Sequence, residues 1–157
     1  MNKNFVSKVL LSLYKSIPQC ILCNEKAVIK RSKFEYSYRR VSNTILLYEE
    51  ILNLNAEKIN LINLKTLIDK AFDLLLDEDR KFLYLRFVKN YKFVDIARRL
   101  DVSMRQVFRM YDTAVNSFQT QLEYLKYPAE RIEEEFGQLS IYKSVSFRLG
   151  NEFGKLE

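Results

Sequence analysis

The sequence predicts an all-α fold, and three observations lead to this prediction. About half of the 157 residues are apolar, so the chain can bury a core. Only three glycines and two prolines occur, which is typical of helices joined by short connections. Apolar side chains recur at helical spacing along most of the chain, most clearly in residues 93–126.

Residues 1–75 are predicted to form a helical N-terminal part. The first helix covers residues 4–16, and Pro18 is expected to end it. Asn43–Leu75 is strongly helical, either as one helix of up to about 50 Å or as two helices broken near Asn55. We expect this segment to pack against the core, and a homodimer contact is the alternative.

Two further features of this part bear reactive or charged side chains. Cys20 and Cys23 form a C-x-x-C, but the chain has no histidine and no other cysteine to complete a metal site. Buried or partly buried free thiols are expected, with a zinc site shared between subunits as the alternative. Lys26–Arg40 is a basic and aromatic stretch that we expect to be a surface connection, in which the alternation of Phe34, Tyr36 and Tyr38 indicates a short strand or an irregular loop. A second phosphate-contacting surface is its alternative role.

Residues 93–115 indicate two helices joined by a short turn. Residues 93–100 place apolar side chains at i, i+3, i+4 and i+7, and Asp101-Val102 breaks this pattern. Ser103 is a good N-cap for the second helix, because its hydroxyl can accept a hydrogen bond from a first-turn amide. Ala97 is small enough to let the second helix approach. This arrangement is typical of a helix-turn-helix.

The second helix, residues 103–126, has two different faces. Its apolar face holds Val107, Tyr111, Ala114 and Phe118. Arg105 and Arg109 fall on the opposite face, with Gln106 on the flank, and these residue types read guanine and adenine in the major groove. An ordinary solvated charged face is the alternative.

The charge of the chain is concentrated in this region. Residues 80–111 contain nine cations and two acids, a net +7, whereas the whole chain carries +6. Such a concentration is the expected footprint of a surface that faces phosphates.

A family resemblance rests on Leu75–Phe87, Asp95–Ala97, Leu100, Val102-Ser103, Val107 and Ala114. Without a gap over about forty residues, these positions resemble the C-terminal DNA-binding module (region 4) of sigma-70-type transcription factors, which recognises the −35 promoter element. Residues 62–75 and 124–136 also resemble small sigma-like proteins of low-GC Gram-positive bacteria, and phage-type transcription regulators use the same module. The resemblance implies a region 4-like helix-turn-helix at residues 76–127, whose reading helix enters double-stranded DNA.

The sequence departs from that family at four positions. Leu76 replaces a frequent proline, and Lys92 replaces a serine or threonine cap, which removes about 1 kcal/mol of local stabilisation. Asn90 and Asp101 replace turn glycines, but both residue types tolerate the left-handed conformation. Arg86 matches a family position that is often structural, so we do not assign it to DNA.

The predicted function is that of a sequence-specific DNA-binding transcription regulator. Predicted base-contacting residues are Met104, Arg105, Gln106 and Arg109, and predicted phosphate-contacting residues are Lys92, Arg98, Arg99 and Ser103. RNA polymerase is a further partner that the resemblance implies. The alternatives are a sigma-like factor bound to RNA polymerase and a protein-interaction module without DNA binding. No catalytic residue, metal site or cofactor is predicted.

Residues 128–157 are predicted to be an acidic segment and a C-terminal tail. Pro128 ends the reading helix near Lys126. Glu130–Phe136 is acidic, so it should face away from DNA or dock on a basic surface such as Lys26–Arg40. Gln138–Glu157 is expected to be a final helix, a partner-binding tail or partly disordered chain. No apolar run could span a bilayer and no secretory signal is evident, so we expect a cytoplasmic protein.

Overall fold

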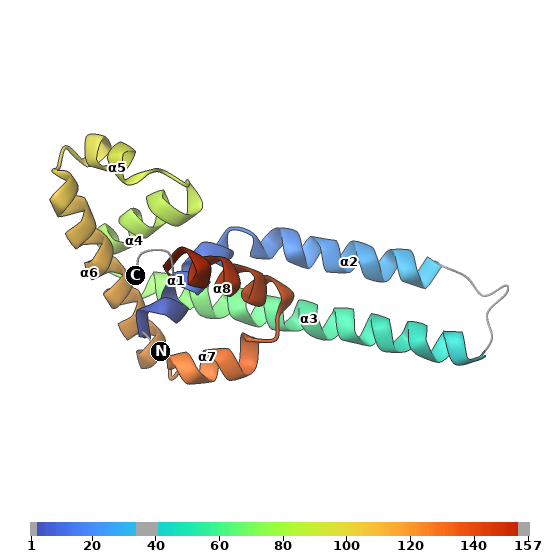
Figure 1. The fold of residues 1–157 in the computed structure, drawn as a ribbon. Coiled ribbons are helices and arrows are strands. Elements are labelled where there is room, and N and C mark those ends of the chain that lie inside the picture. Colours follow the sequence, from blue (N-terminus) through green and yellow to red (C-terminus); the bar gives the residue numbers. More distant parts are fainter. Residues whose placement is uncertain (1–2, 34–40, 154–157) are drawn as a thin grey trace.

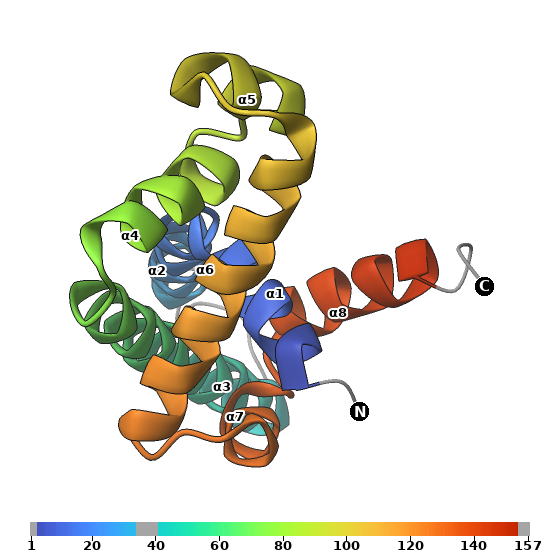
Figure 2. The same cartoon turned by 90° about the vertical axis from the view of Figure 1, so that its left-hand side faces the viewer.

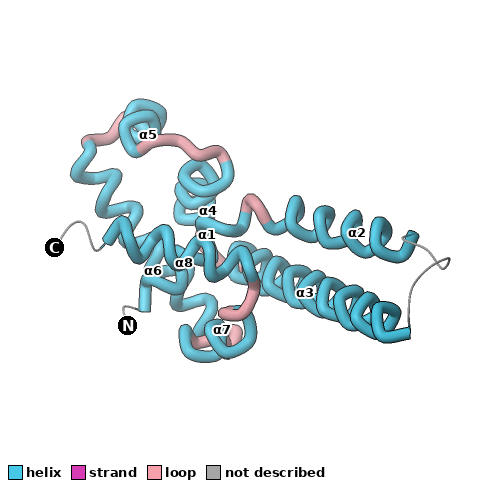
Figure 3. Tube along the Cα trace, turned by 45° about the vertical axis from the view of Figure 1, so that its right-hand side comes forward, coloured by secondary structure: helices cyan, strands magenta, loops and turns pink. Residues whose placement is uncertain are grey.

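A computed structural model describes residues 3–33 and 41–153, and every regular element in these ranges is helical, which confirms the all-α prediction (Figure 1). The elements are α1 (Lys3–Tyr14), α2 (Ile17–Lys33), α3 (Val41–Asp73), α4 (Asp77–Leu83), the π-helical turn η1 (Tyr84–Val88), α5 (Phe93–Leu100), α6 (Met104–Tyr124), α7 (Ala129–Phe136) and α8 (Ser140–Phe153). Short loops join most of them (Figure 3).

The molecule is elongated, with two different ends. Helices α2 and α3 pack against each other as an antiparallel hairpin, which projects from one end as an arm (Figure 1). Helices α4, α5 and α6 form the opposite end. Figure 2 looks onto that end, where α6 runs from α5 down to α7, with α4 on one side and α1 and α8 on the other.

One core joins the body of the molecule. Phe72 of α3 and Phe118 of α6 pack ring against ring at 5.5 Å between centroids, and Leu10 of α1 is fully buried in the same cluster. Ile132 of α7 and Tyr142 of α8 also belong to it. The division into residues 1–75, 76–127 and 128–157 stays a prediction, and all three parts contribute side chains to this core.

The start of the chain differs from expectation in its helix boundaries. The first helix ends at Tyr14, and Pro18 is the second residue of α2 rather than the end of the preceding helix. Proline fits there because a first-turn amide has no helical partner to lose. Lys26–Lys33 continues α2, so a surface connection is wrong for these residues. The predicted strand or loop at Phe34–Tyr38 lies outside the described residues.

The single-helix alternative is correct for the long segment before Leu75. α3 runs without a break from Val41 to Asp73, through Asn55. An interior asparagine costs at most about 0.7 kcal/mol relative to alanine, and packing along α2 outweighs this cost. Two ion pairs, Glu25–Lys58 and Arg31–Glu50, also join the two helices.

Arg80 fixes the joint between α3 and α4. Its guanidinium donates hydrogen bonds to the carbonyls of Phe72, Asp73 and Leu75 at 3.0–3.1 Å, which caps the C-terminal end of α3. Helix α4 is short and irregular at its end, since it stops at Leu83 and continues as the π-helical turn η1.

The C-terminal segments form two further helices. Lys126 has a φ of 63° and breaks the chain direction after α6, and Pro128 then precedes α7. α7 packs on α1 and α3 and buries Ala129, Ile132 and Phe136. Docking on the basic stretch is therefore wrong for its described part, Lys26–Lys33, which lies along the arm. The final-helix alternative is correct for residues 140–153. None of the described helices is long and apolar enough to cross a membrane.

Candidate nucleic-acid interface

The connection between α5 and α6 is tight and is stabilised by local hydrogen bonds. Asp101 adopts the left-handed conformation (φ 53°), which lets its amide and that of Val102 both donate to the carbonyl of Ala97. The Ser103 hydroxyl accepts a hydrogen bond from the Gln106 amide at 3.2 Å, as predicted for an N-cap. The turn therefore fixes the angle at which α6 leaves α5.

α6 divides into a buried face and an exposed face. Val107, Ala114 and Phe118 are buried, whereas Arg105 and Arg109 are exposed on the other side. Gln106 is exposed as well, and Met104 is 37% exposed at the start of the helix. All four predicted base-contacting residues thus lie within the first two turns of α6 and reach solvent.

The predicted phosphate-contacting residues are also exposed, but they are held differently. Within the described residues, Arg98 forms no ion pair or hydrogen bond, and Lys92 precedes α5 without a side-chain cap. Arg99 donates to the Tyr91 hydroxyl at 3.1 Å and lies over its ring, with its Cζ 4.9 Å from the centroid. Arg99 is therefore pre-positioned, and Arg98 is free to reach a ligand.

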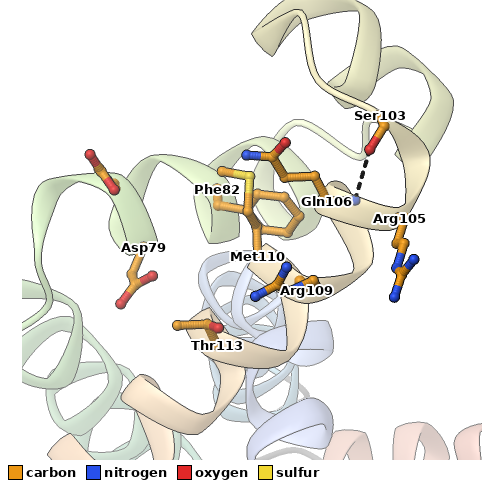
Figure 4. A pocket seen from close by; sticks show the side chains of 9 residues that line it. Asp79, Phe82, Ser103, Arg105, Gln106, Arg109, Met110 and Thr113 are labelled. Atoms are coloured by element: carbon orange, nitrogen blue, oxygen red, sulfur yellow. Dashed lines mark hydrogen bonds between the residues drawn. The ribbon is translucent and has the colours of Figure 1, made fainter.

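An open hollow of about 480 Å³ lies between α4 and the first half of α6 (Figure 4). Arg105, Gln106 and Arg109 line one side of it, and Glu78 and Asp79 of α4 line the other. In Figure 4, Phe82 and Met110 lie between these two sides. The two acids lie in the first turn of α4, and the sequence gave no sign that they would face α6. Their charge disfavours phosphates on the α4 side of α6.

Aromatic rings pack between α5 and α6. Phe93 packs against Phe108 and Tyr111, with ring centroids 5.1 and 5.2 Å apart. Arg86 donates to the Tyr91 carbonyl at 3.1 Å and stacks on Phe93, with its Cζ 4.5 Å from the ring centroid. Arg86 therefore makes contacts within the fold.

Helix α1 contributes contacts to α6 that the sequence did not indicate. The buried Ser7 hydroxyl donates to the Gln119 side-chain carbonyl at 2.5 Å, and Asn4 donates to Asn116 at 2.8 Å. These pairs join residues more than 100 positions apart, for which a single sequence carries no signal. They fix the second half of α6 to α1.

The two cysteines do not form part of this surface. Cys23 is exposed, contrary to the expected burial, while Cys20 is partly buried and burial raises the pKa of its thiol. No cluster of three or more potential metal ligands occurs within the described residues. The described part of the basic stretch, Lys26–Lys33, lies on the arm, at the opposite end of the molecule from α5 (Figure 1).

A family model described as "Protein of unknown function (DUF722)" matches residues 24–120. The chain belongs to the DUF722 family. The match includes most of α2, all of α3, α4 and α5, and most of α6. The family model therefore covers both the arm and the α4–α6 end. No curated protein and no solved structure matches the chain.

Proposed function

We propose that this DUF722 protein is a sequence-specific DNA-binding transcription regulator. In this proposal α5 and α6 form a helix-turn-helix similar to that of sigma-70 region 4, and the first half of α6 enters the major groove. The observation that carries the proposal is the exposure of Arg105, Gln106 and Arg109 on the free face of α6, opposite the buried Val107. An α-helix fits into the major groove, and arginine and glutamine side chains can bind the base edges that the groove exposes.

Two physical features support the assignment of roles. Arg105 and Arg109 are four residues apart, so they lie on the same side of α6 and can reach neighbouring base edges. Arg98 and Arg99 lie at the end of α5, beside the turn, where they would hold the phosphate backbone and set the register of α6. The acids Glu78 and Asp79 disfavour phosphates on the α4 side, so the duplex would approach mainly from the α5 side.

The experiment is selection of duplexes from a random pool by the full chain, followed by fluorescence anisotropy on the selected duplex and on an unrelated one. Arg105→Ala or Arg109→Ala should weaken binding to the selected duplex by about 1–3 kcal/mol and reduce the preference for it. Arg98→Ala should weaken both duplexes alike and lower the slope of log K against log salt by about 0.9.

A matched control is Arg148→Ala, which removes the same charge from an exposed position on α8. It should leave binding to the selected duplex close to that of the native chain. If Arg105→Ala, Arg109→Ala and Arg98→Ala all behave like this control, α6 is not the reading helix and the proposal fails. Absence of salt-sensitive binding by the native chain would favour a protein-interaction module instead.

A further inference from the structure

Helix α3 exposes a continuous apolar stripe along the arm. Its members are Ile45, Tyr48, Leu52, Ile59 and Ile62, with exposures of 56%, 61%, 65%, 55% and 42%. Together with Asn55, they follow spacings of 3, 4, 3, 4 and 3 residues, which is the heptad pattern of a helix that packs along another helix. Single exposed apolar residues are common on proteins, but a stripe over more than four helical turns is not.

The stripe is separate from the face by which α3 packs on α2. Leu47, Ile51 and Leu54 are partly covered and Leu61 is buried, and these residues form a second heptad stripe along the same helix. The two stripes lie about 100° apart around α3, from the angle per residue. A helix with two apolar faces is suited to a bundle in which it has two neighbours. Helices α1, α6 and α7 also pack on α3 in the body of the molecule, but along the arm α2 covers one of the two faces.

Helix α2 extends the exposed face. Leu22 is 40% exposed and Ile29 is 53% exposed. Leu22 lies three residues before Glu25 and Ile29 four residues after it, so all three are on one face of α2. Glu25 pairs with Lys58 of α3 at 3.2 Å, and Lys58 neighbours Asn55 and Ile62 on the helix surface. The exposed apolar residues of α2 and α3 are therefore on the same side of the hairpin.

The stripe is complementary to itself when one copy is reversed, because the spacing 3-4-3-4-3 reads the same in both directions. A two-fold axis across the midpoint between Ile45 and Ile62 sets Ile45 opposite Ile62 and Tyr48 opposite Ile59 of the other copy. Leu52 then faces Asn55 close to the axis. One polar residue in an apolar seam is the device that fixes register in paired helices.

We propose that two copies of this chain associate through this arm face, with their α3 helices antiparallel, to form a four-helix bundle. Ile29 lies level with the middle of the stripe, between the levels of the Arg31–Glu50 and Glu25–Lys58 ion pairs, so it meets its own counterpart near the axis. The proposal does not depend on DNA binding, since the arm and the exposed face of α6 lie at opposite ends of the molecule.

The area of the arm face is close to the area that a specific dimer interface needs. From Ile45 to Ile62 the stripe is about 26 Å long, and the hairpin is two helix diameters, or about 20 Å, wide. The buried area is then on the order of 500 Å² on each copy, or about 1,000 Å² in total, which is near the lower limit for a specific interface. Such an interface predicts a dimer that dissociates on dilution.

The first test is the molar mass of the full chain in solution, measured by sedimentation equilibrium over a range of micromolar concentrations. The native chain should reach twice the monomer mass. Leu52→Glu combined with Ile59→Glu should reduce this mass twofold, because it buries four carboxylates in the apolar interface of the dimer. Both residues are more than half exposed in the single chain, so circular dichroism should show unchanged helix content.

The matched control is Asn53→Glu combined with Asn60→Glu, which introduces the same charges one residue further along on an exposed face away from the stripe. It should remain a dimer. A native chain that is monomeric at the highest concentration, or a dimer that survives Leu52→Glu with Ile59→Glu, would overturn the proposal, as would loss of the dimer in both variants alike.

A second test determines the orientation, on a background with Cys20→Ser and Cys23→Ser. Residue 55 lies within about 5 Å along the axis of its counterpart in the antiparallel dimer, whereas the two copies of residue 66 are about 38 Å apart. A short thiol cross-linker should therefore join two chains through Asn55→Cys and not through Thr66→Cys. Cross-linking of both variants indicates parallel helices, and cross-linking of neither indicates another interface; either result rejects the antiparallel pairing.

Discussion

The two ends of the molecule expose different kinds of side chain, apolar on the arm and cationic on the α4–α6 end, although their helices share one core. The arm exposes apolar side chains such as Tyr48 and Leu52, whereas the α4–α6 end exposes Arg105 and Arg109. Apolar area in water costs about 25 cal/mol per Å², so a partner that covers the arm lowers the free energy of the system. An anion that binds Arg105 and Arg109 also lowers the free energy, but salt screens that interaction. The two ends are therefore suited to partners of different chemistry.

The largest effect is expected where the two ends meet. Phe118 is fully buried and packs on Phe72 of α3, so Phe118→Ala should lower the free energy of unfolding by about 3–5 kcal/mol. Urea unfolding followed by circular dichroism measures this change. Phe108 is a control on the same helix: it is 48% exposed, and its loss should cost about 1 kcal/mol. A separate unfolding transition of the arm in the Phe118→Ala variant would contradict a shared core.

An intermediate effect is expected at the joint between the arm and the α4–α6 end. Arg80→Ala removes hydrogen bonds to two carbonyls at the end of α3 and to the carbonyl of Leu75 just after it, and should lower the free energy of unfolding by about 2 kcal/mol. Arg80→Lys should recover only part of this loss, because an ammonium group cannot span the three carbonyls as the planar guanidinium does. Lys81→Ala, at the exposed neighbouring position, should have little effect. Equal stability of Arg80→Lys and the native chain would indicate that charge alone matters at the joint.

A smaller effect, confined to the α4–α6 end, is expected from the cap of α6. Ser103→Ala removes the acceptor for the Gln106 amide and should cost about 1 kcal/mol, whereas Ser103→Asp should keep the cap. Hydrogen exchange should show faster opening of the first turn of α6 in Ser103→Ala and unchanged exchange in α3. Faster exchange along α3 as well would mean that the two ends are coupled more strongly than the comparison assumes.

The sequence predicted the α4–α6 end better than the arm. The reason is that features of the α5–α6 turn depend on residues close together in the sequence, whereas the arm depends on contacts between distant segments. Ser103 as a cap and Asp101 in the left-handed conformation follow from residues within four positions. The acids Glu78 and Asp79 opposite α6 could not be predicted, because their placement depends on how α4 packs on α6. The helical state of Lys26–Lys33 was missed for the same reason, because α3 stabilises α2 from a distant part of the chain.

By itself, the sequence determined that the chain is helical, that a capped helix begins after Ser103, and that positive charge gathers around it. Only the tertiary structure decided which apolar stripes are covered. The stripes that start at Leu47 and at Ile45 have the same spacing and similar composition, yet α2 packs on the first and leaves the second exposed. Helical periodicity sets the direction of a side chain relative to its own helix axis, but burial also requires a second surface, which the fold brings from elsewhere in the chain.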